Sequence, residues 1–133
     1  MPMIEITEHG GEGYKRLVEY GAWTVAMLRD SYKTSLAGVS YLQKHTQTDE
    51  VFILLQGKCT LIEAGNGDTP DEIHGVSMEP LKYYNVKKGV WHTHILEPDT
   101  CVVVVENIET DLSNSPIVDL TEKQKVQIAA LHK

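Results

Sequence analysis

Two short stretches of the chain hold the residues whose types and spacing could support chemistry. In the first, Gln43 and His45 share one face of an expected strand, and Glu50 follows after a polar turn. If that turn joins antiparallel neighbours, the three side chains converge on one side of a sheet. In the second stretch, His92 and His94 share a face of a later strand. One carboxylate and two imidazoles in a barrel interior are suited to a divalent metal such as Zn²⁺, Mn²⁺, Ni²⁺ or Fe²⁺.

The neighbours of these histidines are candidates for the rest of a site. Tyr41, Phe52 and Trp91 are expected to line a pocket and to contact a small-molecule ligand. Glu50 or His94 would be the acid/base group if a reaction takes place there. The alternative is structural: Glu50 forms a buried ion pair with a histidine, and His94 points toward solvent at the end of its strand.

The elements that must position these residues are expected to be short strands. Apolar and β-branched runs alternate with turn residues over much of the chain. Eight strands at short spacing, with no helices between them, predict an all-β barrel or sandwich. Gly57 is expected to be the turn of a hairpin, and segment 11–20 fits either a strand or a short helix. The expected strands are 22–28, 36–43, 51–56, 58–64, 74–78, 82–86, 91–96 and 100–107.

The C-terminal part of the chain differs from the rest. Residues 108–120 are mostly polar and predict a linker. Thr121 and Gln124 have the spacing of a capping box, which predicts a helix over about 122–131. Its apolar face is expected to hold Val126, Ala129 and Ala130. Residues 1–133 therefore form one domain, with a barrel over about 22–107 and a short C-terminal helix.

Composition limits the classes of function. The net charge of −7 over 133 residues argues against nucleic-acid binding, which needs a basic surface. The longest apolar runs are too short to span a bilayer, and the N-terminus lacks the features of a secretory signal. Cys59 and Cys101 are expected to be small core residues of a cytoplasmic protein. A homodimer is expected, with segment 4–20 covering the sheet edge of a neighbour.

The stretch from His45 to Gly57 resembles the first motif of the cupin superfamily, and residues 89–92 resemble the second. The first motif has the form His-x-His, three or four residues, Glu, six residues, Gly. Glu50 and Gly57 match it at full spacing, His45 stands at the second histidine, and Gln43 stands at the first. The second motif has the form Pro-x-Gly-x-x-His-x-x-x-Asn. Gly89 and His92 match it, whereas Lys87 and Leu96 replace the proline and the asparagine.

The resemblance implies a cupin-type antiparallel β-barrel, also called a jelly roll or double-stranded β-helix. It also implies that His45, Glu50 and His92 face a metal, with Gln43 as the fourth position. An amide oxygen is a weaker donor than imidazole for these ions, so a lower affinity is expected than for a three-histidine site.

A narrower resemblance points to the ureidoglycolate lyase branch of the cupins. It rests on His45, Thr48, Glu50 and Phe52, followed by the Gly89 motif. That branch has glutamine where Glu50 stands, and a second histidine where this chain has Thr93.

Three functions follow as expectations. The first is a cupin that binds a divalent metal and a small polar metabolite and acts as a metal-dependent lyase, isomerase or oxygenase. The second is a metal-free cupin that binds a small molecule in the same pocket. In the third, the pocket residues only satisfy one another. Fold alone does not choose among these functions.

Overall fold

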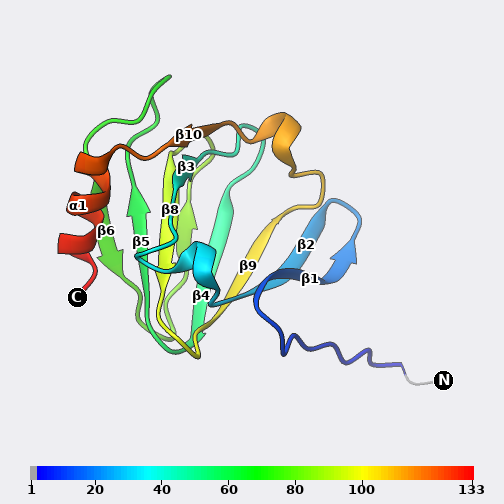
Figure 1. Cartoon of the computed structure of the whole chain (residues 1–133). Helices are drawn as coiled ribbons and strands as arrows, with labels where there is room; N and C mark the ends of the chain where they lie inside the picture. Colours follow the sequence, from blue (N-terminus) through cyan, green and yellow to red (C-terminus); the bar gives the residue numbers. More distant parts are fainter. Residues whose placement is uncertain (1–2) are drawn as a thin grey trace.

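A computed structural model describes residues 3–133, in which two five-stranded antiparallel sheets face each other (Figure 1). Each sheet has one face toward a shared interior. The first sheet has the order β1 (Gly13–Tyr20), β2 (Trp23–Arg29), β9 (Cys101–Asn107), β4 (Glu50–Gln56), β7 (Tyr84–Val86). The second has the order β10 (Ile117–Asp119), β3 (Tyr41–Gln43), β8 (His92–Leu96), β5 (Cys59–Glu63), β6 (His74–Ser77). This is the all-β, cupin-type jelly roll that the motifs imply.

The chain repeatedly crosses from one sheet to the other. β4 and β5 belong to different sheets, so the hairpin expected at Gly57 does not form. β3 and β4 also belong to different sheets, so the turn between them does not join antiparallel neighbours. Gly57 lies in the β4–β5 crossover with φ +85°. A Cβ atom at Gly57 would lie 2.6 Å from the Cα atom of Thr100, which closes the neighbouring crossover. Glycine is required there by the backbone conformation and by this close approach.

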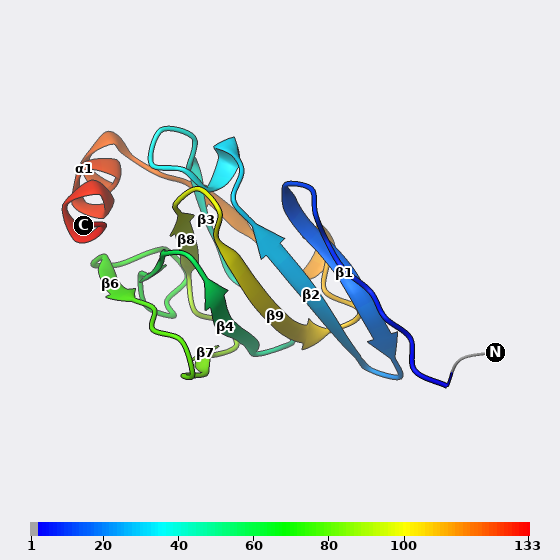
Figure 2. The same ribbon diagram turned by 90° about the horizontal axis from the view of Figure 1, so that it is seen from below.

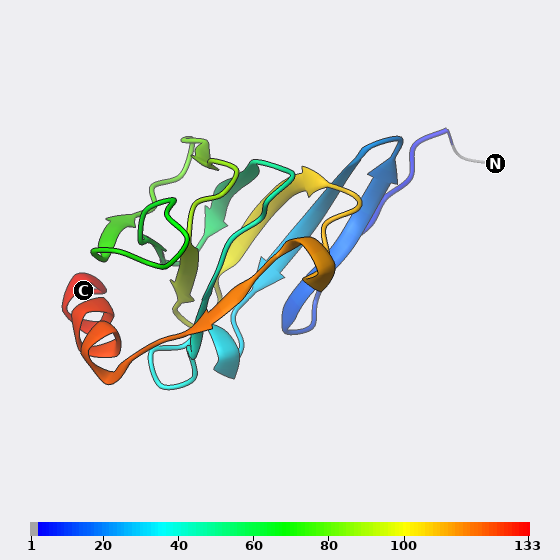
Figure 3. The same ribbon diagram turned by 90° about the horizontal axis from the view of Figure 1, so that it is seen from above.

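Two apolar cores hold the layers together. The core between the sheets is formed by alternate residues of β2, β4 and β9 with residues of β5 and β8; it includes Ala26, Leu28, Phe52, Leu54, Leu61, Leu96, Val102 and Val104. The second core lies on the outer side of the second sheet, under helix α1 (Glu122–Leu131), and includes Leu42, Ile62, Trp91, Ile95 and Ile128. Figures 2 and 3 show α1 at one end of the molecule and the β1–β2 hairpin at the other.

The C-terminal helix forms as predicted, but a different face of it is buried. The side chain of Thr121 accepts from the Gln124 backbone N–H, and the Gln124 side chain accepts from the backbone N–H of Thr121. Ile128 is fully buried, whereas Val126 is exposed. The expected apolar face of Val126, Ala129 and Ala130 is wrong: all three are exposed, and the face of the helix that packs on the second core carries Ile128.

The regular structure extends beyond the predicted barrel range of 22–107. Segment 11–20, which the sequence left open, contributes strand β1, and β10 forms within the predicted linker 108–120. The linker also holds a short 3₁₀ helix, η2 (Leu112–Asn114), and a second one, η1 (Tyr32–Thr34), precedes β3. Within residues 3–133, no helix combines the length and the apolar character needed to cross a membrane.

Candidate functional site

His45, Glu50 and His92 converge at one end of the space between the sheets. His45 follows β3, Glu50 begins β4 on the inner face that also carries Phe52, and His92 begins β8. One ligand atom from each lies within 4.8 Å of the others. The three residues are 9%, 7% and 5% exposed, respectively. They meet because two sheets pack face to face, and not because a hairpin joins their strands.

Glu50 bridges the two histidines. Its Oε1 atom lies 2.9 Å from His92 Nε2 and 3.1 Å from His45 Nε2. Burial raises the pKa of Glu50, but the hydrogen bonds from the two imidazoles outweigh it and hold that pKa well below its usual range. Glu50 is therefore a carboxylate that only accepts hydrogen bonds.

The backbone fixes the protonation of His92 on one side. Its Nδ1 atom donates to the carbonyl oxygen of Val90 at 3.0 Å, and a carbonyl oxygen can only accept. Burial lowers the pKa of His92, but the hydrogen bond and charge of Glu50 outweigh it and raise that pKa. His92 is then an imidazolium that donates from both nitrogens. If it loses the Nε2 proton, that nitrogen becomes a ligand atom already oriented by the Val90 carbonyl.

Residues before β10 complete the wall behind His45. The Nδ1 atom of His45 lies 2.7 Å from the Ser115 hydroxyl, which is itself buried. Gln43 Nε2 donates to the Ser115 carbonyl oxygen at 3.3 Å, and Gln43 pairs with His92 in the β3–β8 register. The predicted linker therefore positions both Gln43 and His45.

The structure adds two residues that the sequence interpretation missed. Glu106, on the inner face of β9, has an Oε2 atom 3.9 Å from His45 Nε2, and its Oε1 atom accepts from the Tyr14 hydroxyl at 2.8 Å. Burial and the charge of Glu50 raise the pKa of Glu106 to about 7. Its Oε2 atom is buried and has no hydrogen-bond partner among residues 3–133. The signal for Glu106 was a lone carboxylate ending the apolar run of β9; β1, which supplies Tyr14, was left unassigned.

His94 does not join the three-residue group. It lies one step further along the inner face of β8, with its ring 5.7 Å from that of Phe52 between centroids. Burial, followed by the charge of His92, lowers the pKa of His94 to about 4. Its Nδ1 atom is buried without a hydrogen-bond partner among the described residues. His94 is thus a neutral imidazole within the cleft and does not point toward bulk solvent.

An open cleft of about 960 Å³ leads from the surface to these groups. Tyr41 and Gln43 line it together with His45, Glu50, His92, His94 and Glu106. Phe52 lies behind the histidine rings in the core. Trp91 is not a wall of the cleft, contrary to the expectation: it precedes the inward-facing His92, so strand alternation turns it into the second core, where its Nε1 donates to the Gly67 carbonyl oxygen.

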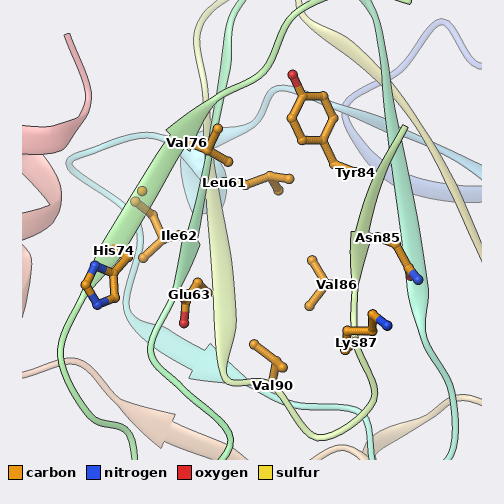
Figure 4. A pocket seen from close by; sticks show the side chains of 11 residues that line it. Leu61, Ile62, Glu63, His74, Val76, Tyr84, Asn85, Val86, Lys87 and Val90 are labelled. Atoms are coloured by element: carbon orange, nitrogen blue, oxygen red, sulfur yellow. The ribbon is translucent and has the colours of Figure 1, made fainter. Parts of the chain in front are cut away.

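A second cavity of about 470 Å³ lies between β5 and β6 on one side and β7 on the other (Figure 4). Its walls are mostly apolar and include Leu61, Val76 and Val86, with Glu63 and His74 at the side. None of the predicted site residues lines it. His45, Glu50 and His92 lie together in the larger cleft instead.

The donor set of the cleft fits a divalent metal. Two imidazole nitrogens and one carboxylate are the protein ligands of many catalytic metal sites. The hydrogen bond from His92 Nδ1 to a backbone carbonyl is the usual outer contact of a metal-binding histidine. The group also satisfies itself by direct hydrogen bonds, so the same geometry is compatible with a metal-free site.

Comparison with known proteins supports the fold and leaves the function open. No protein-family model matches the chain, and no curated protein sequence matches it. Among solved structures, Pac13 from Streptomyces with uridine superposes with a TM-score of 0.61 and 9% identity, over 96% of this chain and 98% of that one. Protein SO0799 from Shewanella oneidensis gives 0.58 and 12%, over 90% and 85%. KdgF from Halomonas sp. gives 0.52 and 14%, over 74% and 79%.

These similarities are structural, since all three identities are below 15%. They confirm the cupin-type barrel implied by the two motifs. They do not support the narrower resemblance to ureidoglycolate lyase. Pac13 is described as a nucleoside dehydratase built on a β-barrel.

Proposed function

We propose that the cleft binds one divalent metal ion through His45, Glu50 and His92. The observation that carries this proposal is the buried group of three ligand atoms within 4.8 Å of one another at the end of an open cleft. Gln43 supplies the fourth, weaker donor through its amide oxygen. When bound, such an ion would polarise an oxygen atom of a substrate as a Lewis acid.

We propose further that the substrate is a small, uncharged molecule rich in hydroxyl groups. The charged side chains along the cleft are the carboxyl groups of Glu12, Glu50, Glu106 and Asp111, against the ammonium group of Lys33 and the imidazolium of His92. A carboxylate or phosphate substrate would be repelled by this lining. A hydroxyl group can instead donate to the buried Oε2 atom of Glu106, which otherwise has no partner among residues 3–133.

The reaction that this arrangement supports is a lyase reaction such as the loss of water. A carboxyl group with a pKa of about 7 can take up and release a proton near neutral pH, and Glu106 has this property. Tyr14 holds the Oε1 atom of Glu106, which leaves Oε2 for the substrate. The structural similarity to a nucleoside dehydratase makes uridine a suitable probe.

Metal binding is tested by calorimetric titration of EDTA-treated protein with Zn²⁺, Ni²⁺ and Mn²⁺. Wild-type protein should bind one ion per chain, and His45→Ala and His92→Ala should lose this binding. His74→Ala is the matched control, because His74 is exposed on β6 outside the cleft. Equal binding by all four proteins would refute the site.

Substrate binding is tested separately by saturation-transfer NMR with uridine. Glu106→Gln should weaken the signal, whereas Glu109→Gln, an exposed residue three positions along, should not. If neither substitution changes uridine binding, Glu106 does not contact the substrate as proposed.

A metal-free binding site is the second candidate. It is favoured by the direct contacts of 2.9 and 3.1 Å, in which Glu50 Oε1 already accepts from both imidazoles. In that case the metal titrations show no binding by any variant, while uridine binding and its dependence on Glu106 remain.

A further inference from the structure

The outer face of the first sheet carries a continuous apolar surface, which we name the outer patch. In β2, β4 and β9, residues that alternate with the core residues are also apolar. Two rows run across the strands: Val25 beside Val105 and Val51, and Met27 beside Val103 and Ile53. All six side chains are partly exposed. Strands with apolar residues on both faces are typical of sheets that are covered on both sides.

Nothing in residues 3–133 covers the outer patch. Helix α1 packs on the other sheet through Ile128. The first residues that the structure describes, from Met3 onward, extend away from the body, with Ile4 and Ile6 exposed at 76% and 89% (Figures 1 and 2). Around the patch, Tyr20, Trp23 and Leu55 add large apolar side chains that are 74%, 44% and 54% exposed.

We propose that the outer patch is the interface of a homodimer, in which two copies pack this sheet face to face. Flat sheets pack in this way at a separation of about 10 Å, with their strands about 30° apart. The six central residues carry no charge, so two copies, each with a net charge of −7, can meet there without placing like charges together. This arrangement differs from the pairing of sheet edges expected from the sequence.

The size of the patch fits a dimer. Three strands about 4.8 Å apart, each seven residues long at about 3.3 Å per residue, cover about 330 Å² in projection. This is the size of the functional apolar patches found on monomers. Tyr20, Trp23 and Leu55 extend the apolar surface beyond this projection, toward the ~800 Å² per partner of a standard interface.

Other occupants fit less well. An extended peptide cannot add to β2, β9 or β4, because both edges of each strand are already paired within the sheet. An anionic membrane would require clustered basic residues around the patch, and the chain has a net negative charge. The same sheet of a second copy needs neither a free strand edge nor clustered basic residues.

The proposal is tested by measuring the molar mass with light scattering during gel filtration. Wild-type protein should have about twice the chain mass of 14.9 kDa. Val105→Lys, at the centre of the patch, should give the monomer mass. Val126→Lys is the matched control, because the same substitution lies on the exposed face of α1 and should leave the dimer intact. A monomeric wild-type protein, or a Val105→Lys protein that remains dimeric, overturns the proposal.

Folding and burial are checked independently. Circular dichroism should show that Val105→Lys is folded; if it is not, Leu55→Lys at the more exposed margin takes its place with the same expected result. The chain has two tryptophans, and Trp91 is already buried at 2% exposure. Dilution of wild-type protein should therefore shift the emission of Trp23 to longer wavelength, and Trp23→Phe should abolish this shift. If the protein is diluted until the dimer dissociates and the emission spectrum does not change, Trp23 is not at the interface and the proposal is contradicted.

Discussion

Replacing Glu50 by glutamine removes the negative charge that lies between two buried imidazoles. In the wild-type protein, Glu50 Oε1 accepts hydrogen bonds from His92 and His45 at 2.9 and 3.1 Å. In Glu50→Gln the buried imidazolium of His92 has no counter-charge, so it must lose its proton or remain unpaired. Removing one partner of a buried ion pair costs about 3 to 5 kcal/mol. We expect Glu50→Gln to lower the free energy of unfolding by about 3 kcal/mol at pH values where Glu50 and His92 are both charged in the wild-type protein.

The loss depends on pH in a way that follows from the two pKa shifts. The pKa of Glu50 lies below its usual 4.5, so its contribution to stability is present above pH 4.5 and disappears as the pH falls through the native pKa. The pKa of His92 lies above its usual 6.5, so its contribution is present below pH 6.5 and disappears as the pH rises through the native pKa. Both contributions coexist between these values. Well above pH 6.5 His92 Nε2 has no proton to donate, and the remaining loss is that of the charged acceptor of the hydrogen bond from His45, about 1 kcal/mol.

The assay is urea unfolding of both proteins in EDTA, at about pH 5.5 and about pH 8.5. With a denaturant slope of about 1 to 3 kcal/mol/M, a difference of about 2 kcal/mol between the two pH values shifts the midpoint by about 1 M. Glu79→Gln is the control, because its ion pair with Lys82 is exposed and should contribute little at either pH. An equal loss for Glu50→Gln at both pH values would refute the assigned charges.

Three further outcomes are expected. Gln43→His should tighten Zn²⁺ or Ni²⁺ binding about tenfold, or about 1.4 kcal/mol, because imidazole is the better donor; unchanged calorimetric affinity would exclude Gln43 from the metal shell. Gly57→Ala should lower the urea midpoint by the equivalent of about 2 kcal/mol or more, since φ is +85° and the new methyl group collides with Thr100. Tyr14→Phe should weaken uridine binding and leave metal binding unchanged, because it frees only the Oε1 atom of Glu106; loss of metal affinity would contradict this division of roles.

The sequence predicted the elements more accurately than their partners. Helix α1 was predicted to the residue, because a capping box is a local signal with a defined hydrogen-bond pattern. Eight strands were expected from local alternation, but β1 was left open between strand and helix, and β10 lies in the predicted linker. Which strands pair is decided by packing across the barrel, so the hairpin expected at Gly57 was wrong, and the turn after His45 does not join antiparallel neighbours.

In the candidate site, too, residues within a local motif were predicted and residues brought in by packing were not. His45, Glu50 and His92 were grouped correctly through motif spacing, and the structure brings them within 4.8 Å. Glu106 was missed because it lies near the end of an apolar run that carries no motif. Trp91 was placed in the pocket for its nearness to His92, although adjacent residues of a strand face opposite sides.

Metal binding and the metal-free hydrogen bonds make competing demands on the same nitrogen atoms. In the metal-free protein both nitrogens of His92 donate, Nδ1 to the Val90 carbonyl oxygen and Nε2 to Glu50. Because the Nδ1 proton is held by that carbonyl, a metal can bind only at Nε2, which must first lose its proton. His45 can present Nε2 without net loss of a proton, by moving its proton to Nδ1 and donating it to the Ser115 hydroxyl.

Metal binding should therefore release protons in a countable number. His92 gives up one at about pH 6, where its raised pKa keeps it charged. Glu106 releases part of a second proton. Burial and the charge of Glu50 raise its pKa to about 7, and a bound cation would offset the charge of Glu50 and so lower that pKa. Calorimetric titration with Zn²⁺ in two buffers of different ionisation enthalpy measures this number directly. We expect between one and two protons per ion in wild-type protein, and close to one in Glu106→Gln. Binding without proton release would mean that His92 Nε2 is not a ligand, and the metal would then lie outside the His45–Glu50–His92 group.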